Sequence, residues 1–149
     1  MTPKIPPPVL MLLTALIMWL LAAVTPAWAR LSYLPWLSAV VAVGALALMA
    51  AGVWAFRRAA TTVHPFKPDQ TRQIVDSGVF AYSRNPMYLG MACLLAAWAW
   101  WLGALPAWLG VPLFVWIIGR WQIAHEEAVL LQKFGEPYRD YCRRVRRWL

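Results

Sequence analysis

Two polar segments interrupt this very apolar chain, and the first carries residue types that bind small charged molecules. Ser83-Arg84-Asn85-Pro86 directly precedes the third apolar run. Asn is a good helix N-cap and Pro a good first helical residue, so a helix is expected to begin here. Its free N–H groups and positive dipole end, with Arg84 beside them, suit a carboxylate or phosphate. Tyr88 is placed to stack on or hydrogen-bond a ligand, and Gly90 permits close approach of a ligand or another backbone.

The second segment, from Arg120 to Leu131, is predicted to continue the fourth apolar helix beyond the membrane, and it contains two adjacent carboxylates. Glu127 falls on the apolar face, and Glu126 falls on a wetter face with Gln122 and Lys133. A carboxylate that faces a core at the membrane edge is costly unless it is paired. Glu127 is therefore expected either to pair with Arg84 or to face a cationic ligand. The apolar neighbours of Glu127 at helical spacing are Ile123, Ala124, Leu130, Leu131 and Phe134.

Neither a metal site nor a disulfide framework is predicted. His125-Glu126-Glu127 lacks the second His that a helical metalloprotease motif places one turn away. The other histidine, His64, lies far along the chain. Cys93 stands in an apolar run and Cys142 among arginines, so both are expected to be free thiols.

The composition predicts a membrane protein. The chain has 149 residues, of which 62% are hydrophobic and 13% charged, and a mean hydropathy of +0.54. A soluble domain of this size leaves too much of its surface exposed to hide so much apolar area.

Four apolar runs predict an all-α integral membrane bundle with four crossings. The first two, 9–28 and 34–56, each have about the 20 residues needed to cross the hydrocarbon core. After the polar loop, the stretch 85–119 carries no charge and is too long for one crossing. Gly103 and Pro106 break it, so we expect a tight hairpin of two helices, 86–102 and 106–121. Ala27-Trp28-Ala29 also resembles a signal-peptidase site. We favour a retained first span over a cleaved signal peptide.

The basic residues predict the orientation. Twelve of the 14 Lys and Arg residues lie in the 57–85 loop or from Arg120, at the end of the fourth span, onward. The positive-inside rule then places that loop and both termini in the cytoplasm. This distribution and attraction to anionic lipid account for the net charge of +8 without nucleic-acid binding. Tryptophans 28, 36, 100, 101 and 108 are expected near the outer interface, and Trp54 and Trp121 near the inner one.

The cytoplasmic segments are expected to differ in structure. The loop at 61–69 holds two prolines and is not expected to be helical, and 74–82 is expected to be extended with a turn at Asp76-Ser77-Gly78. Gly135-Glu136-Pro137 interrupts the helix that follows the fourth span. A last helix is expected to run to the chain end and to lie on anionic lipid. Its apolar face would carry Tyr138, Tyr141, Val145 and Trp148, and the tyrosines would close a pocket from below.

The two polar segments together resemble one enzyme family. Ser83-Arg84-Asn85-Pro86-Met87-Tyr88-Leu89-Gly90 is similar to an Arg-His-Pro-x-Tyr-x-Gly signature. Glu126-Glu127-Ala128-Val129-Leu130, with the Phe134-Gly135-Glu136-Pro137-Tyr138 and Tyr141 pattern that follows, resembles the ending of the same family. The chain from about residue 57 thus resembles the superfamily of isoprenylcysteine carboxyl methyltransferases and phospholipid methyltransferases, which are integral membrane enzymes.

This resemblance implies S-adenosylmethionine (SAM) as the methyl donor and a cofactor pocket on the cytoplasmic side. The acceptor would be a lipidic or membrane-borne small molecule in the bacterial inner membrane. It also implies one domain over 1–149, in which 1–56 supplies two spans and 57–149 the cofactor-binding catalytic region. The implied catalytic residues are Arg84, Glu127 and Arg147. The implied cofactor-binding residues are Arg84, Asn85, Pro86, Tyr88, Leu89, Gly90, His125, Glu126, Glu127 and Tyr138.

The chain departs from the family pattern at Asn85, where the family often has His. Asn does not titrate near neutral pH, so if the family's His acts as a base, either the chemistry of this chain differs or the base lies elsewhere, at His64 or His125. Two alternatives remain open: an NADPH-dependent membrane reductase of the sterol-reductase type, and a non-catalytic four-span protein. The acceptor atom and the oligomeric state are not indicated by the sequence.

Overall fold

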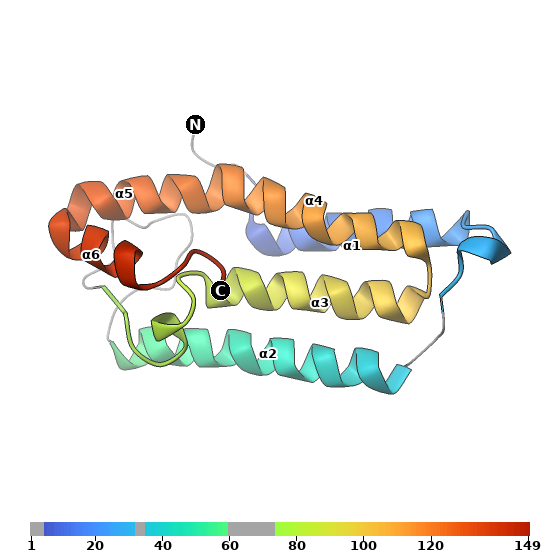
Figure 1. The fold of residues 1–149 in the computed structure, drawn as a ribbon, viewed down its shortest axis with the longest axis horizontal. Coiled ribbons are helices and arrows are strands. Elements are labelled where there is room, and N and C mark those ends of the chain that lie inside the picture. Colours follow the sequence, from blue (N-terminus) through green and yellow to red (C-terminus); the bar gives the residue numbers. More distant parts are fainter. Residues whose placement is uncertain (1–4, 32–34, 60–73) are drawn as a thin grey trace.

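The computed structural model describes residues 5–31, 35–59 and 74–149, and within them the fold is all-α. Four helical rods lie side by side with alternating direction (Figure 1). They are α1 (Pro7–Ala23), α2 (Pro35–Arg58), α3 (Pro86–Leu102) and a continuous helical run from Leu105 to Phe134. The expected loop at 61–69, with His64, lies outside the described residues.

The fourth rod is built from several helical segments. The 3₁₀ turn η4 (Leu105–Leu109) leads into α4 (Gly110–Ile117), the π-helical turn η5 (Ile118–Ile123) and α5 (Ala124–Phe134). A π-turn adds a residue to the helical repeat and re-aims the side chains that follow it. The rod extends past the ends of its neighbours, so α5 stands beyond the bundle beside α6 (Glu136–Arg144) (Figure 1).

Within the described part of the chain, two helices are long and apolar enough to cross a membrane, Pro35–Arg58 and Leu105–Phe134. The shorter α1 and α3 have 17 residues each, which is at the lower end of the range for a crossing. The predicted bounds of α3, 86–102, match the structure. Gly103 ends α3 in the left-handed conformation at φ 57°, which is the usual role of Gly after a helix, and the predicted hairpin is confirmed.

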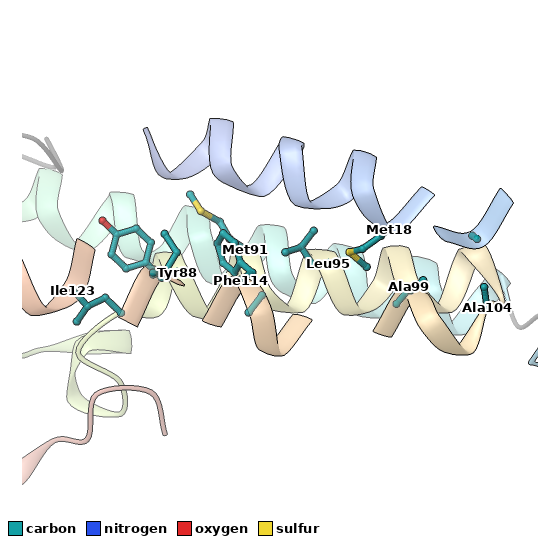
Figure 2. Packing of buried hydrophobic residues seen from close by; sticks show 12 residues of the cluster. Met18, Tyr88, Met91, Leu95, Ala99, Ala104, Phe114 and Ile123 are labelled. Carbon is teal, nitrogen blue, oxygen red and sulfur yellow. The ribbon is translucent and has the colours of Figure 1, made fainter. Parts of the chain in front are cut away.

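Helix α3 is the centre of the bundle, and α1, α2 and α4 pack against it. Figure 2 shows the core along α3, from Tyr88 at one end to Ala104 at the other. Met18, Leu95 and Phe114 are fully buried in this core and come from three different helices. Many side chains on the outer faces of α1, α2 and α4 are large, apolar and exposed, which is the pattern of a lipid-facing surface.

Helices α2 and α3 approach closely through small residues. The buried residues of α2 are Ser38, Ala45 and Gly52, spaced by seven, and the Ser38 hydroxyl donates to the Ala97 carbonyl at 2.6 Å. A Cβ at Gly90 would meet the Met49 side chain and would lie 3.0 Å from the Ala45 carbonyl oxygen. Close contact through small residues and cross-helix hydrogen bonds is how helices associate in lipid. Gly90 therefore serves the approach of another backbone.

One arginine joins helix ends on the side of the bundle away from α6. The 3₁₀ turn η1 (Ala27–Ala29) is followed by Arg30, which donates to the Ala22 carbonyl at 2.9 Å and to the Leu102 carbonyl at 3.4 Å. These carbonyls lie at the C-terminal ends of α1 and α3, where a cation is favourable. The basic residue between the first two spans thus holds two helix ends together.

The segment before α3 and the end of the chain differ in part from expectation. Gly78 has φ 61°, as the predicted turn requires, but it opens the 3₁₀ turn η3 (Gly78–Ala81) and the segment is not extended throughout. The last helix, α6, ends at Arg144, and Val145 is extended, so Trp148 does not continue the helical face. The expectation that this face lies on lipid is also wrong: Tyr138 and Tyr141 are buried against protein, in a cluster completed by Ile74, Leu130, Phe134, Cys142 and Val145.

Candidate functional site

The start of α3, the α5 helix and the chain end come together at one end of the bundle. Figure 1 shows the C-terminus beside the first turn of α3, and the fourth rod running above them before it continues into α5. Two backbone-level contacts fix the chain end there. The Arg84 N–H donates to the Arg146 carbonyl at 3.1 Å, and the Asn85 side-chain amide donates to the Arg147 carbonyl at 3.0 Å. We call residues 145–149 the C-terminal strap.

Glu127 is the centre of an ion-pair cluster that joins these three parts. The Arg84 guanidinium lies 3.1 Å from Glu127 Oε1, and its side chain and that of Glu127 are only 14% and 18% exposed. Arg147 donates its Nε to Glu127 Oε1 at 3.1 Å and its Nη2 to Glu127 Oε2. These hydrogen bonds to Glu127 raise the pKa of Arg147, so its guanidinium is firmly charged. The expected pairing of Glu127 with Arg84 is confirmed.

The cluster has one more positive than negative charge, and it keeps unused donors. Two guanidinium groups share one carboxylate. Within the described residues, Arg84 Nε is the buried side-chain polar atom that has no hydrogen-bond partner. Arg147 uses Nε and Nη2 on Glu127, and no partner is present for its Nη1 in the described part of the chain. Unused guanidinium donors in a partly desolvated cluster are suited to a carboxylate or phosphate.

Glu126 has different surroundings, although it is the next residue. Its Oε1 accepts a hydrogen bond from the Tyr88 hydroxyl at 2.6 Å and another from the Gln122 amide at 2.6 Å. Tyr88 and Gln122 are themselves buried, at 4% and 3% exposure. The expectation that Glu126 lies on the wetter face is therefore wrong. The helical spacing correctly placed Glu126 and Gln122 on the same face of the helix. That face is turned toward the core, where the buried Tyr88 and Gln122 side chains both donate to Glu126.

Glu126 is a carboxylate without a cation. Among the described residues it forms no ion pair, and both of its hydrogen bonds go to Oε1. Its Oε2 has no hydrogen-bond partner among the described residues. Burying an ionised carboxylate with neutral partners alone is unfavourable, and a cationic ligand relieves the cost. Two arginines therefore surround Glu127, which makes that position net positive, and the next position, Glu126, is net negative.

Other predicted site residues have mainly structural surroundings. Asn85 and Pro86 begin α3 as expected, but the Asn85 side chain makes no cap hydrogen bond to its own helix. Gly90 faces α2, away from the ion-pair cluster. Leu89 and His125 are half-buried. Tyr138 is buried in the cluster between α5 and α6, where desolvation raises its pKa and keeps the phenol neutral.

Two residues of this region, Gln122 and Cys142, were not predicted from the sequence as site residues. Gln122 bonds Glu126, and its position four residues earlier on the same helix was the available signal. Cys142 Sγ accepts a hydrogen bond from the Arg84 guanidinium. No local pattern pointed to Cys142, because its contact depends on how α6 folds back onto the start of α3.

Comparison with known proteins assigns the family. A sequence profile of the phospholipid methyltransferase family matches residues 33–137. The chain belongs to the phospholipid methyltransferase family. The match includes α2, α3, the fourth rod and the start of α6, and it supports methyl transfer as the class of reaction of this family member.

Individual relatives agree with this assignment. The mouse protein-S-isoprenylcysteine O-methyltransferase is 33% identical over 129 residues, which cover 79% of this chain and 43% of the mouse protein. The fission yeast (Schizosaccharomyces pombe) protein of the same name is 30% identical over 53% of this chain and 34% of its own length. The chain thus spans less than half the length of these two relatives. An uncharacterized Haemophilus influenzae protein is 52% identical over its full length and 42% of this chain. No solved structure matches.

Proposed function

We propose that this protein is a SAM-dependent methyltransferase that modifies a lipidic or membrane-borne acceptor. The observation that carries the proposal is that two positions of opposite charge lie next to each other: the two guanidinium groups of Arg84 and Arg147 around Glu127, and the carboxylate of Glu126. Glu127 lies within a cluster that has a surplus guanidinium, and Glu126 has no cationic partner among the residues that the structure describes. The amino-acid part of SAM is a zwitterion with a carboxylate and an ammonium, so it matches both positions at once.

The residues present fit this cofactor. The buried Arg84 Nε, which has no partner in the described residues, and the Arg147 Nη1 are donors for the carboxylate. Glu126 Oε2 is the acceptor for the ammonium. When bound, SAM supplies an electrophilic methyl group on a sulfonium. The roles proposed for the start of α3, for His125 and for Tyr138 are packing around the nucleoside.

The chain's own contribution to catalysis is orientation and desolvation. Methyl transfer needs the acceptor held in line with the donor, and positioning of this kind lowers the barrier substantially. Arg84, Glu127 and Arg147 form a rigid network that joins three segments, so a ligand held by it has a fixed orientation. The apolar core that begins at Tyr88 excludes water from the membrane side.

We further propose four membrane crossings within one domain, in which α2 and the fourth rod are joined by the shorter α1 and α3. The termini and α6 would face the cytoplasm of a bacterium, because the arginine-rich end of the bundle carries the proposed site. SAM would then arrive from the cytoplasm and the acceptor from the inner membrane. The names of the mouse and yeast relatives specify an isoprenylcysteine acceptor. For this chain we propose a hydrophobic small molecule as the acceptor.

Calorimetric titration of the full chain in detergent tests the proposal. SAM and S-adenosylhomocysteine are expected to bind, and NADPH is not. Binding of NADPH alone would support the reductase alternative, and binding of none of the three would leave a non-catalytic membrane protein. Incubation of membranes that contain the protein with methyl-labelled SAM should then move the label into the lipid-extractable fraction, compared with membranes that contain the Arg84→Ala variant.

A further inference from the structure

The Asn85 side chain does not cap α3, although Asn85 stands at the N-cap position of that helix. An Asn at a helix N-cap usually accepts a hydrogen bond from an N–H of its own first turn. Here the Asn85 side chain makes no cap hydrogen bond, and its amide nitrogen donates to the Arg147 carbonyl at 3.0 Å. The contact joins residues that are 62 positions apart in the chain. Asn85 therefore bonds the strap and not its own helix.

Arg147 is consequently held at both of its ends. Its carbonyl is bound by Asn85, and its guanidinium is bound by Glu127 through Nε and Nη2. The preceding carbonyl, that of Arg146, accepts the Arg84 N–H, and the following residue, Trp148, packs against the main core. A long arginine side chain loses much rotamer entropy when it is fixed, and a fixed backbone reduces the cost of aiming it.

We propose that Asn85 is a positioning residue that sets the C-terminal strap so that Arg147 is aimed at Glu127 and at the bound carboxylate. The inference rests on the proposed function, since the carboxylate is that of the cofactor. It assigns Asn85 no direct contact with the cofactor and no proton transfer. Its amide N–H is the functional group, and it acts through the Arg147 backbone.

A double-mutant cycle on S-adenosylhomocysteine binding tests this coupling. Asn85→Ala and Arg147→Ala are each expected to raise the dissociation constant by about tenfold, as loss of one charge-assisted contact does. The double variant should bind no more weakly than Arg147→Ala alone, because Asn85 acts only through Arg147. Arg146→Ala is the matched control: it removes an exposed side chain but keeps the backbone carbonyl, so its affinity should stay within about twofold of the parent.

Two further variants separate positioning from folding. Asn85→Asp has nearly the same shape but no N–H donor, and should behave like Asn85→Ala. Asn85→His retains a donor and should recover part of the affinity. Limited trypsin digestion, read by mass spectrometry, should cut faster after Arg146 and Arg147 in Asn85→Asp than in the parent, because the strap is released.

Each failure has its own meaning. If the parent does not bind S-adenosylhomocysteine, the proposed function fails. If the parent binds and Asn85→Ala binds equally well, or if the two single effects multiply in the double variant, the positioning role is wrong. An equal trypsin rate for parent and Asn85→Asp also overturns it. If Asn85→Ala does not fold, the Asp and His variants decide, and equal affinity in both contradicts the proposal.

Discussion

The two adjacent glutamates of α5 show how partners, rather than residue type, determine what a side chain is suited to do. Glu127 has two guanidinium groups as partners and stabilises the fold of three segments. Glu126 has a phenol and an amide as partners and no cation among the described residues, and its proposed role is to bind the cationic group of the ligand. Functional groups of this kind are kept at some cost to stability, since an uncompensated buried charge is unfavourable.

A Glu126→Gln variant should separate stability from binding. The amide is nearly isosteric and its oxygen still accepts the Tyr88 hydrogen bond, but it has no charge to desolvate. We expect unchanged or higher thermal stability in detergent and about a tenfold weaker affinity for S-adenosylhomocysteine, corresponding to roughly 1.4 kcal/mol. Thermal unfolding and calorimetric titration measure the two quantities. Loss of stability with unchanged affinity would show that Glu126 is structural.

Glu127→Ala should have the opposite effect on stability, because it leaves two guanidinium groups side by side. The cluster is partly buried, so we expect a loss of about 2 kcal/mol in the free energy of unfolding. For a chain of this size that corresponds to a fall of about 4–8 °C in the melting temperature. Glu136→Ala is the matched control, since its ion pairs with Arg139 and Arg143 are exposed. A smaller effect of Glu127→Ala than of Glu136→Ala would contradict the central role of the cluster.

At the scale of elements, the α2–α3 contact depends on the absence of side chains. Gly90→Val would drive a branched side chain into Met49 and the Ala45 carbonyl. We expect a loss of about 1–3 kcal/mol from this overpacking. Gly44→Ala on the same helix pair is the control, because nothing lies within 4 Å of its Cβ, and a helical Ala should be neutral or slightly stabilising. Thermal unfolding in detergent compares the two, and equal melting temperatures would refute the close approach.

The π-turn η5 should determine which way α5 faces. It lies between α4 and the two glutamates, and the residues after it are set by its extra residue. Inserting one alanine after Gly119, whose Cβ position is open, should add one residue of helix before α5 and rotate α5 by about 100°. Glu126 would then leave Tyr88. We expect unchanged helical circular dichroism and loss of S-adenosylhomocysteine binding, and retained binding would show that the register of α5 does not matter.

These elements also show what could be predicted from the sequence. The bounds of α3 follow from Asn85-Pro86 at one end and Gly103 at the other, since each residue type acts locally. The pairing of Glu127 with Arg84 followed from the cost of a buried charge. The orientation of Glu126 did not, because it depends on Tyr88, a residue 38 positions earlier. The fold of the strap was missed for the same reason: Val145 and Trp148 have helical spacing, but the helix ends at Arg144, and long-range contacts of the Arg146 and Arg147 carbonyls hold the strap against the start of α3.

At the scale of the whole molecule, the two ends of the bundle differ in charge. The end that carries α6 and the strap is rich in arginine. At the opposite end, Arg30 is the one basic residue within the described part of the chain. Its guanidinium donates hydrogen bonds to the carbonyls of Ala22 and Leu102. This asymmetry is the physical basis for the proposed orientation, because cytoplasmic segments retain positive charge when helices insert. Trp100 and Trp108, which pack edge to face, lie toward the Arg30 end, as expected of an interfacial aromatic pair.

Cysteine labelling across the membrane tests this orientation directly. In a chain with Cys93 and Cys142 replaced, Tyr82→Cys and Trp28→Cys each place one thiol at a strongly exposed position, 78% and 85% in the parent. A membrane-impermeant maleimide should label Trp28→Cys in intact spheroplasts and Tyr82→Cys only in inside-out vesicles. Both thiols reacting from the same side would mean that the bundle does not span the membrane, and the reverse pattern would mean that the arginine-rich end, with the proposed SAM site, faces away from the cytoplasm where SAM is made.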